Sequence, residues 1–350
     1  MGEEEQDSVG AAAGAFRSFS ALAERQPGRY GHKPFLTWYD DARGERVELS
    51  YGTFDNWVAK VANLLVEELG AGPGDRVAAV LVDHWQAAVV LAACWRAGVG
   101  VVVAAPGAGT AEVAAALDGT VAAFVREEWV ADAGQAAGGT TLVALTADLA
   151  GRSDHDLGAA LRFARVVPAM GDLFSGDADP EGEALHLLPA TPATATPTTA
   201  TPEAAAAAGD PAGEPRATTG EAATMAGLLG EAARLVEATG LGDGDRLLSG
   251  LGLLSPAGAA AGLLAPFGAG AGVVLARPFD PGRFWRLVAA ERVTVAALTL
   301  GQAGALLAAG RPPDDLDRSR LRVVACPAGP VPEALRGSFR ERLDVPLAET

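Results

Sequence analysis

Two stretches of this chain share the same order of turn, strand, helix and strand. Each opens with a Gly-x-Gly-Asp-Arg turn, at residues 72–76 and 242–246. After the first turn, the continuous apolar run 76–82 predicts a buried strand, 84–97 a helix and 99–104 another buried strand. Strands that are apolar throughout and alternate with helices are typical of parallel sheets covered on both faces. We therefore expect two related α/β subdomains with mostly parallel sheets flanked by helices, although chance similarity between Ala- and Gly-rich segments could also produce the repeat.

The remaining elements follow from local patterns. The β-rich runs 35–39 and 46–51 flank a polar turn and predict a hairpin. From Thr53 to Leu69 apolar side chains recur at helical spacing, and Gly70 ends the helix. Further strands are expected at 121–125, 141–145, 293–298 and 321–326. Further helices are expected at 221–238, in the Gly- and Ala-rich segment that ends at Phe267, at 281–291, and starting at Gln302 and at Pro332.

A low-complexity segment separates the two halves. Residues 187–216 read LLPATPATATPTTATPEAAAAAGDPAGEPR. Its prolines prevent a long helix, and its lack of large apolar side chains excludes it from a core. The predicted organisation is a frayed N-terminus over 1–30, a first α/β subdomain over 31–186, a linker over 187–219 and a second α/β subdomain over 220–350.

The composition and charge of the chain limit the kinds of partner it can bind and the cellular compartment it suits. The chain has 350 residues and a net charge of −17, which disfavours nucleic acid and anionic membranes as partners. The two cysteines, Cys94 and Cys326, lie in apolar contexts without metal-ligand spacing, so we expect buried reduced thiols. The acidic N-terminus does not resemble a signal peptide, and we expect a cytoplasmic protein. The histidines are scattered, and no metal site is predicted.

Four stretches together resemble the adenylate-forming superfamily, which includes acyl-CoA synthetases, adenylation domains and luciferases. They are LSYGTFDNWVAKVANLLVEELGAGPGDRVAAVL, AAVVLAACWRAGVGVVVAAPG, the run from DRLLSGL to LTLG, and LRVVACPAGPVPEALRGSFRERLDVPLAET. The likeness covers roughly residues 33–110 and 220–350, and the N-terminal part also resembles short, uncharacterised actinobacterial relatives. The resemblance implies the N-terminal domain fold of that superfamily. For an active member it also implies ATP and magnesium as cofactors and a carboxylic acid or acyl group as ligand.

The resemblance places a phosphate-binding loop in the low-complexity segment. Such a loop needs glycines, hydroxyls and a final Pro-Lys to hold the ATP phosphates. One alignment uses 190–199, with Thr191 and Thr194 but no Gly or Lys; the other uses 213–220, with Gly213 and with Arg216 in the lysine position. Neither matches a competent loop.

Other positions that the resemblance implies also depart from the family pattern. Leu254 and Ser255 stand where an aromatic residue and His usually border the acyl pocket. The turn expected against adenine reads Pro327, Ala328, Gly329 and Pro330 instead of Gly-Gly-Ala-Pro. The sequence ends at AET, where the family's Tyr-Gly-x-Thr-Glu stretch is expected to begin, and Lys33 and Lys60 match neither family lysine.

These departures lead to three alternatives for function. The first is a degenerate AMP-dependent synthetase-like domain, non-catalytic alone, that retains an acyl or nucleotide pocket or serves another protein as a partner surface. The second is a fragment of an active ATP-dependent carboxylate–CoA ligase completed by another chain. The third is an unrelated Rossmann-like binding module. No catalytic residue is assigned.

Overall fold

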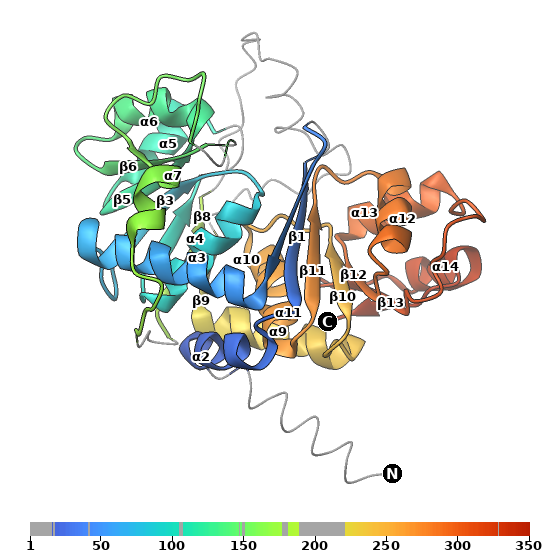
Figure 1. The fold of residues 1–350 in the computed structure, drawn as a ribbon. Helices are drawn as coiled ribbons and strands as arrows, with labels where there is room; N and C mark the ends of the chain where they lie inside the picture. Colours follow the sequence, from blue (N-terminus) through green and yellow to red (C-terminus); the bar gives the residue numbers. More distant parts are fainter. Residues whose placement is uncertain are drawn as a thin grey trace. The chain divides into compact units, whose positions relative to one another are not determined.

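The computed structural model describes residues 16, 18–40, 43–104, 108–146, 148, 151–176, 181–188, 221–327 and 329–350 (Figure 1). These residues form two compact units. Unit 1 contains the described residues up to Gly52 and from Ala226 onward, and unit 2 contains those from Thr53 to Met225.

Unit 1 is built on a sheet with the strand order β14-β13-β12-β10-β11-β1-β2. Neighbouring strands are parallel except for the antiparallel pair β1 and β2 at one edge. The strands are β1 (Pro34–Asp40), β2 (Glu45–Ser50), β10 (Arg246–Ser249), β11 (Gly272–Ala276), β12 (Val295–Ala297), β13 (Val323–Cys326) and β14 (Leu347–Glu349). The helical segments are α2 (Phe19–Tyr30), α9 (Met225–Thr239), α10 (Pro256–Ala259), the π-helical η4 (Ala260–Leu264), α11 (Ala265–Ala269), α12 (Pro281–Ala290), α13 (Leu300–Ala309) and α14 (Glu333–Leu343).

Unit 2 repeats this arrangement with the strand order β7-β6-β5-β3-β4-β8-β9. Here too the described strands are parallel except for the last pair, β8 and β9. The strands are β3 (Arg76–Val80), β4 (Gly100–Val103), β5 (Ala122–Arg126), β6 (Thr141–Leu145), β7 (Leu161–Arg162), β8 (Glu183–Leu187) and β9 (Glu221–Thr224). The helical segments are α3 (Tyr51–Asn63), the π-helical η1 (Leu64–Glu68), α4 (Trp85–Arg96), α5 (Thr110–Leu117), η2 (Glu127–Trp129), α6 (Val130–Ala136), α7 (Phe163–Val166) and η3 (Val167–Ala169). The prediction of two mostly parallel sheets flanked by helices is confirmed.

The two Gly-x-Gly-Asp-Arg turns have matching geometry. Asp75 Oδ2 accepts a hydrogen bond from Gly72 N at 2.8 Å, and Asp245 Oδ2 accepts one from Gly242 N at 2.9 Å. The glycine before each aspartate has a left-handed φ, +89° at residue 74 and +85° at residue 244, which a side chain would disfavour. Each turn delivers its arginine to the first position of a central strand.

The structure differs from the predicted boundaries in three places. The 35–51 hairpin was expected in the first subdomain, but Leu36 pairs with Val273, so β1 joins the sheet of unit 1. Residues 221–224 form β9, which pairs with β8 in unit 2, and the helix expected from Glu221 begins at Met225. These pairings join segments far apart in sequence, which local patterns do not reveal.

The third difference is α2, which lies in the stretch predicted to be frayed. Phe19, Leu22 and Tyr30 are buried on one side of this helix. Pro27 lies inside it and obscures the helical pattern. Residues 1–15 and most of the predicted linker, 189–219, lie outside the described residues. In sequence, residues 188–220 separate the antiparallel strands β8 and β9.

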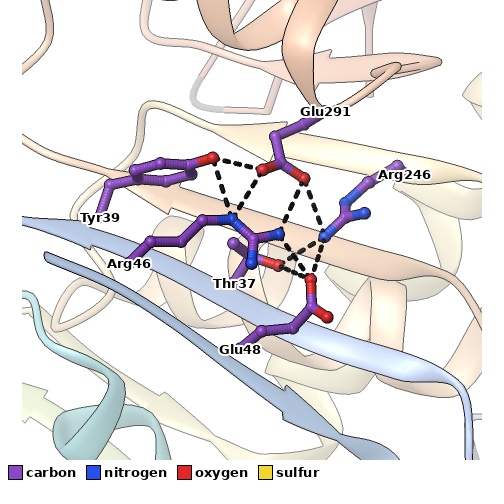
Figure 2. A network of polar contacts seen from close by, with 6 residues as sticks. All are labelled: Thr37, Tyr39, Arg46, Glu48, Arg246 and Glu291. Carbon is purple, nitrogen blue, oxygen red and sulfur yellow. Dashed lines mark hydrogen bonds and ion pairs between the residues drawn. The ribbon is translucent and has the colours of Figure 1, made fainter.

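A polar network ties the β1–β2 hairpin to the centre of the unit 1 sheet (Figure 2). Arg46 on β2 donates from Nε to Glu291 Oε1 at 3.0 Å, and Tyr39 on β1 donates its hydroxyl to the same carboxylate. Arg246 on β10 pairs with Glu291 Oε2 at 3.0 Å and with Glu48 Oε2 at 3.2 Å. Burial alone would raise the pKa of Glu291, but the hydrogen bonds from Arg46 and Tyr39 hold it below its usual value.

Candidate functional site

The described candidate site residues lie in two loops at the carboxyl edge of the unit 1 sheet. In open parallel sheets, ligands bind beyond the carboxyl ends of the strands. Leu254 and Ser255 lie in the loop after β10, and Gly329 and Pro330 lie in the turn after β13. Thr191, Thr194, Gly213, Arg216 and Ala328 lie outside the described residues.

The loop after β10 is closed by its own hydrogen bonds. Ser255 Oγ donates to Gly252 O at 2.8 Å and accepts from Gly258 N at 3.1 Å, so its hydroxyl caps α10. A Cβ atom at Gly258 would lie 1.8 Å from Gly252 O, which shows how closely the backbone folds back on itself. The side chain of Leu254 is buried, with 6% exposure. Leu254 and Ser255 therefore serve the packing and capping of this loop.

The end of β10 is linked to the neighbouring strands by two side chains that the sequence analysis did not single out. Gly250 O accepts a hydrogen bond from Arg277 Nη1 and another from Gln302 Nε2, each at 2.7 Å. Gln302 is fully buried and forms a capping box with Thr299 at the start of α13. The Thr-x-x-Gln spacing is a signature of such a box and would have marked Gln302 in advance.

The turn after β13 is held by a carboxylate from β14. Glu349 Oε2 accepts from Val331 N at 3.1 Å and from Arg336 Nη2 at 2.6 Å. Gly329 has a φ of +129°, a conformation that favours glycine. No local sequence pattern marks this link, because Glu349 and Arg336 meet only when α14 returns the chain to the sheet.

A hollow beside the carboxyl ends of β10 and β11 has largely apolar walls. Two hydrogen bonds connect residues at this hollow to the surrounding protein: Asp280 Oδ1 accepts from Arg283 N at 2.6 Å, and Arg283 Nη1 donates to Arg277 O at 3.2 Å. The lining side chains are Leu248, Ser249, Ala276, Pro278, Phe279, Asp280, Arg283, Phe284 and Leu287, with Gly250 completing the wall.

The two lysines of the chain are both engaged within their own units. Lys33 Nζ pairs with Asp243 Oδ1 at 2.5 Å in unit 1. Lys60 Nζ donates to Pro168 O at 3.2 Å and to Met170 O at 2.6 Å in unit 2. Both lysines are therefore bound to groups of the protein itself.

The two cysteines are buried and unpaired, as the sequence predicted. Cys94 and Cys326 are free, buried thiols, and burial raises the pKa of Cys326 to about 12. Within the described ranges, no group of three His, Cys, Asp or Glu side chains is placed to hold a metal ion. Among the same residues, no helix has the length and apolar character needed to cross a membrane.

Comparison with known proteins matches this chain to one family. The profile of the family described as AMP-binding enzyme matches residues 23–188 and 215–350. A TIGR03089 family protein of Mycobacterium tuberculosis is 57% identical over 65 residues, which is 19% of this chain and 27% of that protein.

Solved structures agree on the fold. An acyl-CoA synthetase of Brucella canis aligns with a TM-score of 0.73 and 16% identity, over 94% of this chain and 56% of that protein. The anthranilate CoA ligase AuaEII, solved in complex with anthranoyl-AMP, aligns with a TM-score of 0.70 and 18% identity, over 95% and 58% of the two chains. This chain thus spans little more than half the length of these synthetases. The resemblance inferred from the sequence is confirmed, and the chain belongs to the AMP-binding enzyme family.

Proposed function

We propose that this chain is an acyl-CoA synthetase-like domain that does not adenylate a carboxylate by itself. The observation that carries the proposal is the engagement of both lysines, Lys33 with Asp243 and Lys60 with backbone carbonyls. Transfer of an adenylyl group needs positively charged protein groups beside the anionic ATP phosphates. Each preorganised group of this kind stabilises the transition state by about 2.7–4 kcal/mol.

The segment between β8 and β9 supports the same proposal through its sequence. Residues 190–199, ATPATATPTT, contain neither glycine nor lysine, and the alternative 213–220 offers only Arg216 as a cation. Proline cannot donate from its backbone nitrogen, and alanine does not readily take the left-handed turns that cradle phosphates. Thr191, Thr194 and Gly213 alone would therefore hold a triphosphate poorly.

The described carboxyl edge of unit 1 also fits ATP and magnesium badly. Several of its hydrogen-bonding groups already bond within the protein: Arg277 and Gln302 to Gly250 O, Ser255 within its own loop, and Glu349 to Arg336. A ligand would have to displace these bonds before it could use the same atoms. We derive no reaction step through the nucleotide. In this proposal Gly329, Pro330 and Ala328 form an altered remnant of the adenine turn, and the chain retains at most weak binding of an acyl group or nucleotide.

A second candidate is supported by the length comparison. The chain covers 56% and 58% of two solved synthetases, so a ligase could be completed by groups on another polypeptide. ATP and magnesium would then be its cofactors and a carboxylic acid its substrate. In both candidates the free, buried thiols suit the reducing cytoplasm, where we place the protein.

Trapping of an acyl-adenylate with hydroxylamine distinguishes the proposal from its alternative. The purified chain, ATP, magnesium and hydroxylamine are incubated with fatty, aromatic and amino acids, and hydroxamate is measured. We expect no hydroxamate above a heat-inactivated control. Hydroxamate formed by the chain alone would overturn the proposal, and hydroxamate that requires a second, co-purified polypeptide would establish the alternative.

A further inference from the structure

A surface segment of unit 2, residues 168–176, is held in place through its backbone. We call this segment the strap. Lys60 and Asn63 on α3 and Arg96 on α4 donate to its carbonyl oxygens. The acceptors are Pro168, Met170, Gly171, Leu173 and Phe174, at donor–acceptor distances from 2.6 to 3.2 Å. Three side chains thus fix the path of a segment that has little secondary structure of its own.

The strap displays apolar side chains to solvent. Among the described residues, the large apolar side chains that are exposed are Leu173, with 86% exposure, and Val66, with 42%. Both adjoin Asn63: Leu173 O accepts from Asn63 Nδ2 at 3.0 Å, and Val66 lies about one helical turn beyond Asn63. Met170 and Phe174 on the strap are half-buried. Single exposed apolar residues are common, but here Leu173 and Val66 lie on two segments that the hydrogen bond from Asn63 links.

The fixed backbone makes these side chains suitable anchors for binding. Asn63 and Arg96 are themselves buried, at 7% and 8% exposure, so the donors that hold the strap are well ordered. The strap would therefore lose little backbone entropy when a partner covers Leu173, because it is ordered before binding. Methionine and phenylalanine, the types found at residues 170 and 174, are enriched in the cores of protein interfaces.

The charge around the anchors indicates the charge of the partner's surface. Glu67, Glu68 and Asp172 are adjacent in sequence to the two anchors and are exposed. Of the nearby cations, Lys60 and Arg96 hold the strap, and Arg165 is exposed three residues before it, so acidic groups outnumber free cations around the anchors. An acidic rim repels anionic membranes, and a second copy of a chain with net charge −17 would meet it with charge of the same sign.

We propose that the strap, with Leu173 and Val66 as anchors, is a docking surface for a different protein that offers an apolar pocket rimmed by Lys or Arg. The proposal does not depend on whether the chain is catalytic, since its residues lie in unit 2 and outside the carboxyl edge of unit 1. A protein partner was one of the alternatives that the sequence left open.

Site-specific cross-linking tests this surface in cells that make the protein naturally. The photoreactive p-benzoylphenylalanine is placed at position 173 and, as a control, at Ala131, which is exposed on α6 of the same unit. We expect a cross-link to a different protein from position 173 and none from position 131. Equal labelling at the two positions, a product containing two copies of this chain, or cross-linking to lipid would overturn the proposal.

Binding of the cross-linked protein, once purified, gives the second readout. We expect Leu173→Asp to weaken the affinity of this protein at least about tenfold. The separate variant Glu67→Lys should also weaken binding, and added salt should weaken the wild-type complex. Ala131→Asp is the matched control and should leave affinity unchanged. Leu173→Asp should fold normally, because the strap is held through carbonyl groups and the side chain is exposed. Equal affinity of Leu173→Asp and the wild type would refute the docking surface.

Discussion

Arg246 and Glu291 form an ion pair, with Arg246 Nη2 3.0 Å from Glu291 Oε2, that joins the first residue of β10 to the end of α12. The same carboxylate binds Arg46 and Tyr39 of the β1–β2 hairpin (Figure 2). Glu291 has only 7% exposure, whereas the Arg46 side chain has 41%. One buried carboxylate thus connects strands from distant parts of the sequence.

Replacing Glu291 should weaken unit 1. Glu291→Gln keeps the shape but removes one of the two carboxylates that Arg46 and Arg246 share, and we expect a loss of about 1–3 kcal/mol in the free energy of unfolding. Urea denaturation monitored by circular dichroism measures the change. Glu333→Gln is the control, because Glu333 is 94% exposed and lies 4.0 Å from Arg336, and it should cost less than about 0.5 kcal/mol. Equal effects of the two substitutions would contradict the importance of the network.

The network should also make stability depend on pH. Burial opposes ionisation of Glu48 and Glu291, yet hydrogen bonds from arginine lower the pKa of both below the usual 4.5. A carboxylate with a lowered pKa in the folded state contributes its stabilisation above pH 4.5 and loses it as the pH falls through the folded value. The difference in unfolding free energy between wild type and Glu291→Gln should therefore shrink from pH 6 toward pH 3. A difference that stays constant over this range would show that the carboxylate charge is not responsible.

Two glycines in helical segments of unit 1 should respond to alanine in opposite directions. A Cβ at Gly258 would lie 1.8 Å from Gly252 O, so Gly258→Ala must distort the loop after β10 and should destabilise by more than about 2 kcal/mol. Gly304 lies within α13 with nothing within 4 Å of its Cβ position, so Gly304→Ala should stabilise by about 0.5–1 kcal/mol. Thermal unfolding of both variants checks the signs. A Gly258→Ala protein as stable as wild type would show that this loop is not closed as described.

Much of the parallel core was predictable because its strands are continuous apolar runs. Residues 76–80, 100–103 and 141–145 form strands as expected, and the two Gly-x-Gly-Asp-Arg turns marked the repeat. The pairing of β1 with β11 was not predictable, since Leu36 and Val273 meet only in the assembled sheet. The short edge strands β7 and β14 carry too few residues to show a pattern.

The sequence resemblance predicted a candidate site, and the structure shows which loops hold its described residues. The resemblance placed Leu254, Ser255, Gly329 and Pro330 in the loops after β10 and β13, and the structure puts those loops on one edge of the sheet. The bonds that occupy this edge depend on side chains from other elements, such as Gln302 and Arg336, and so required the structure.

Restoring the phosphate loop alone should not create activity. Replacing residues 190–199 with a Gly/Ser/Thr-rich loop that ends in Pro-Lys supplies one lysine but leaves Pro327 and Ala328 in the adenine turn and Leu254 in the core. Groups that act together in catalysis are not recovered singly. The loop variant should form no more hydroxamate than the wild type, and a carboxylate-dependent increase would show that the loop is the only defect.

Exchange of labelled pyrophosphate into ATP tests the central claim most directly, because it reports reversible adenylate formation without the later transfer to a thiol. The purified wild-type chain is assayed with magnesium, ATP and a panel of fatty, aromatic and amino acids, beside a heat-inactivated sample and an active benzoate CoA ligase. We predict no carboxylate-dependent exchange above the inactivated sample. Exchange that depends on a carboxylate and persists after contaminating ligases are removed would contradict the account and indicate that the threonine-rich segment or Arg216 binds phosphate.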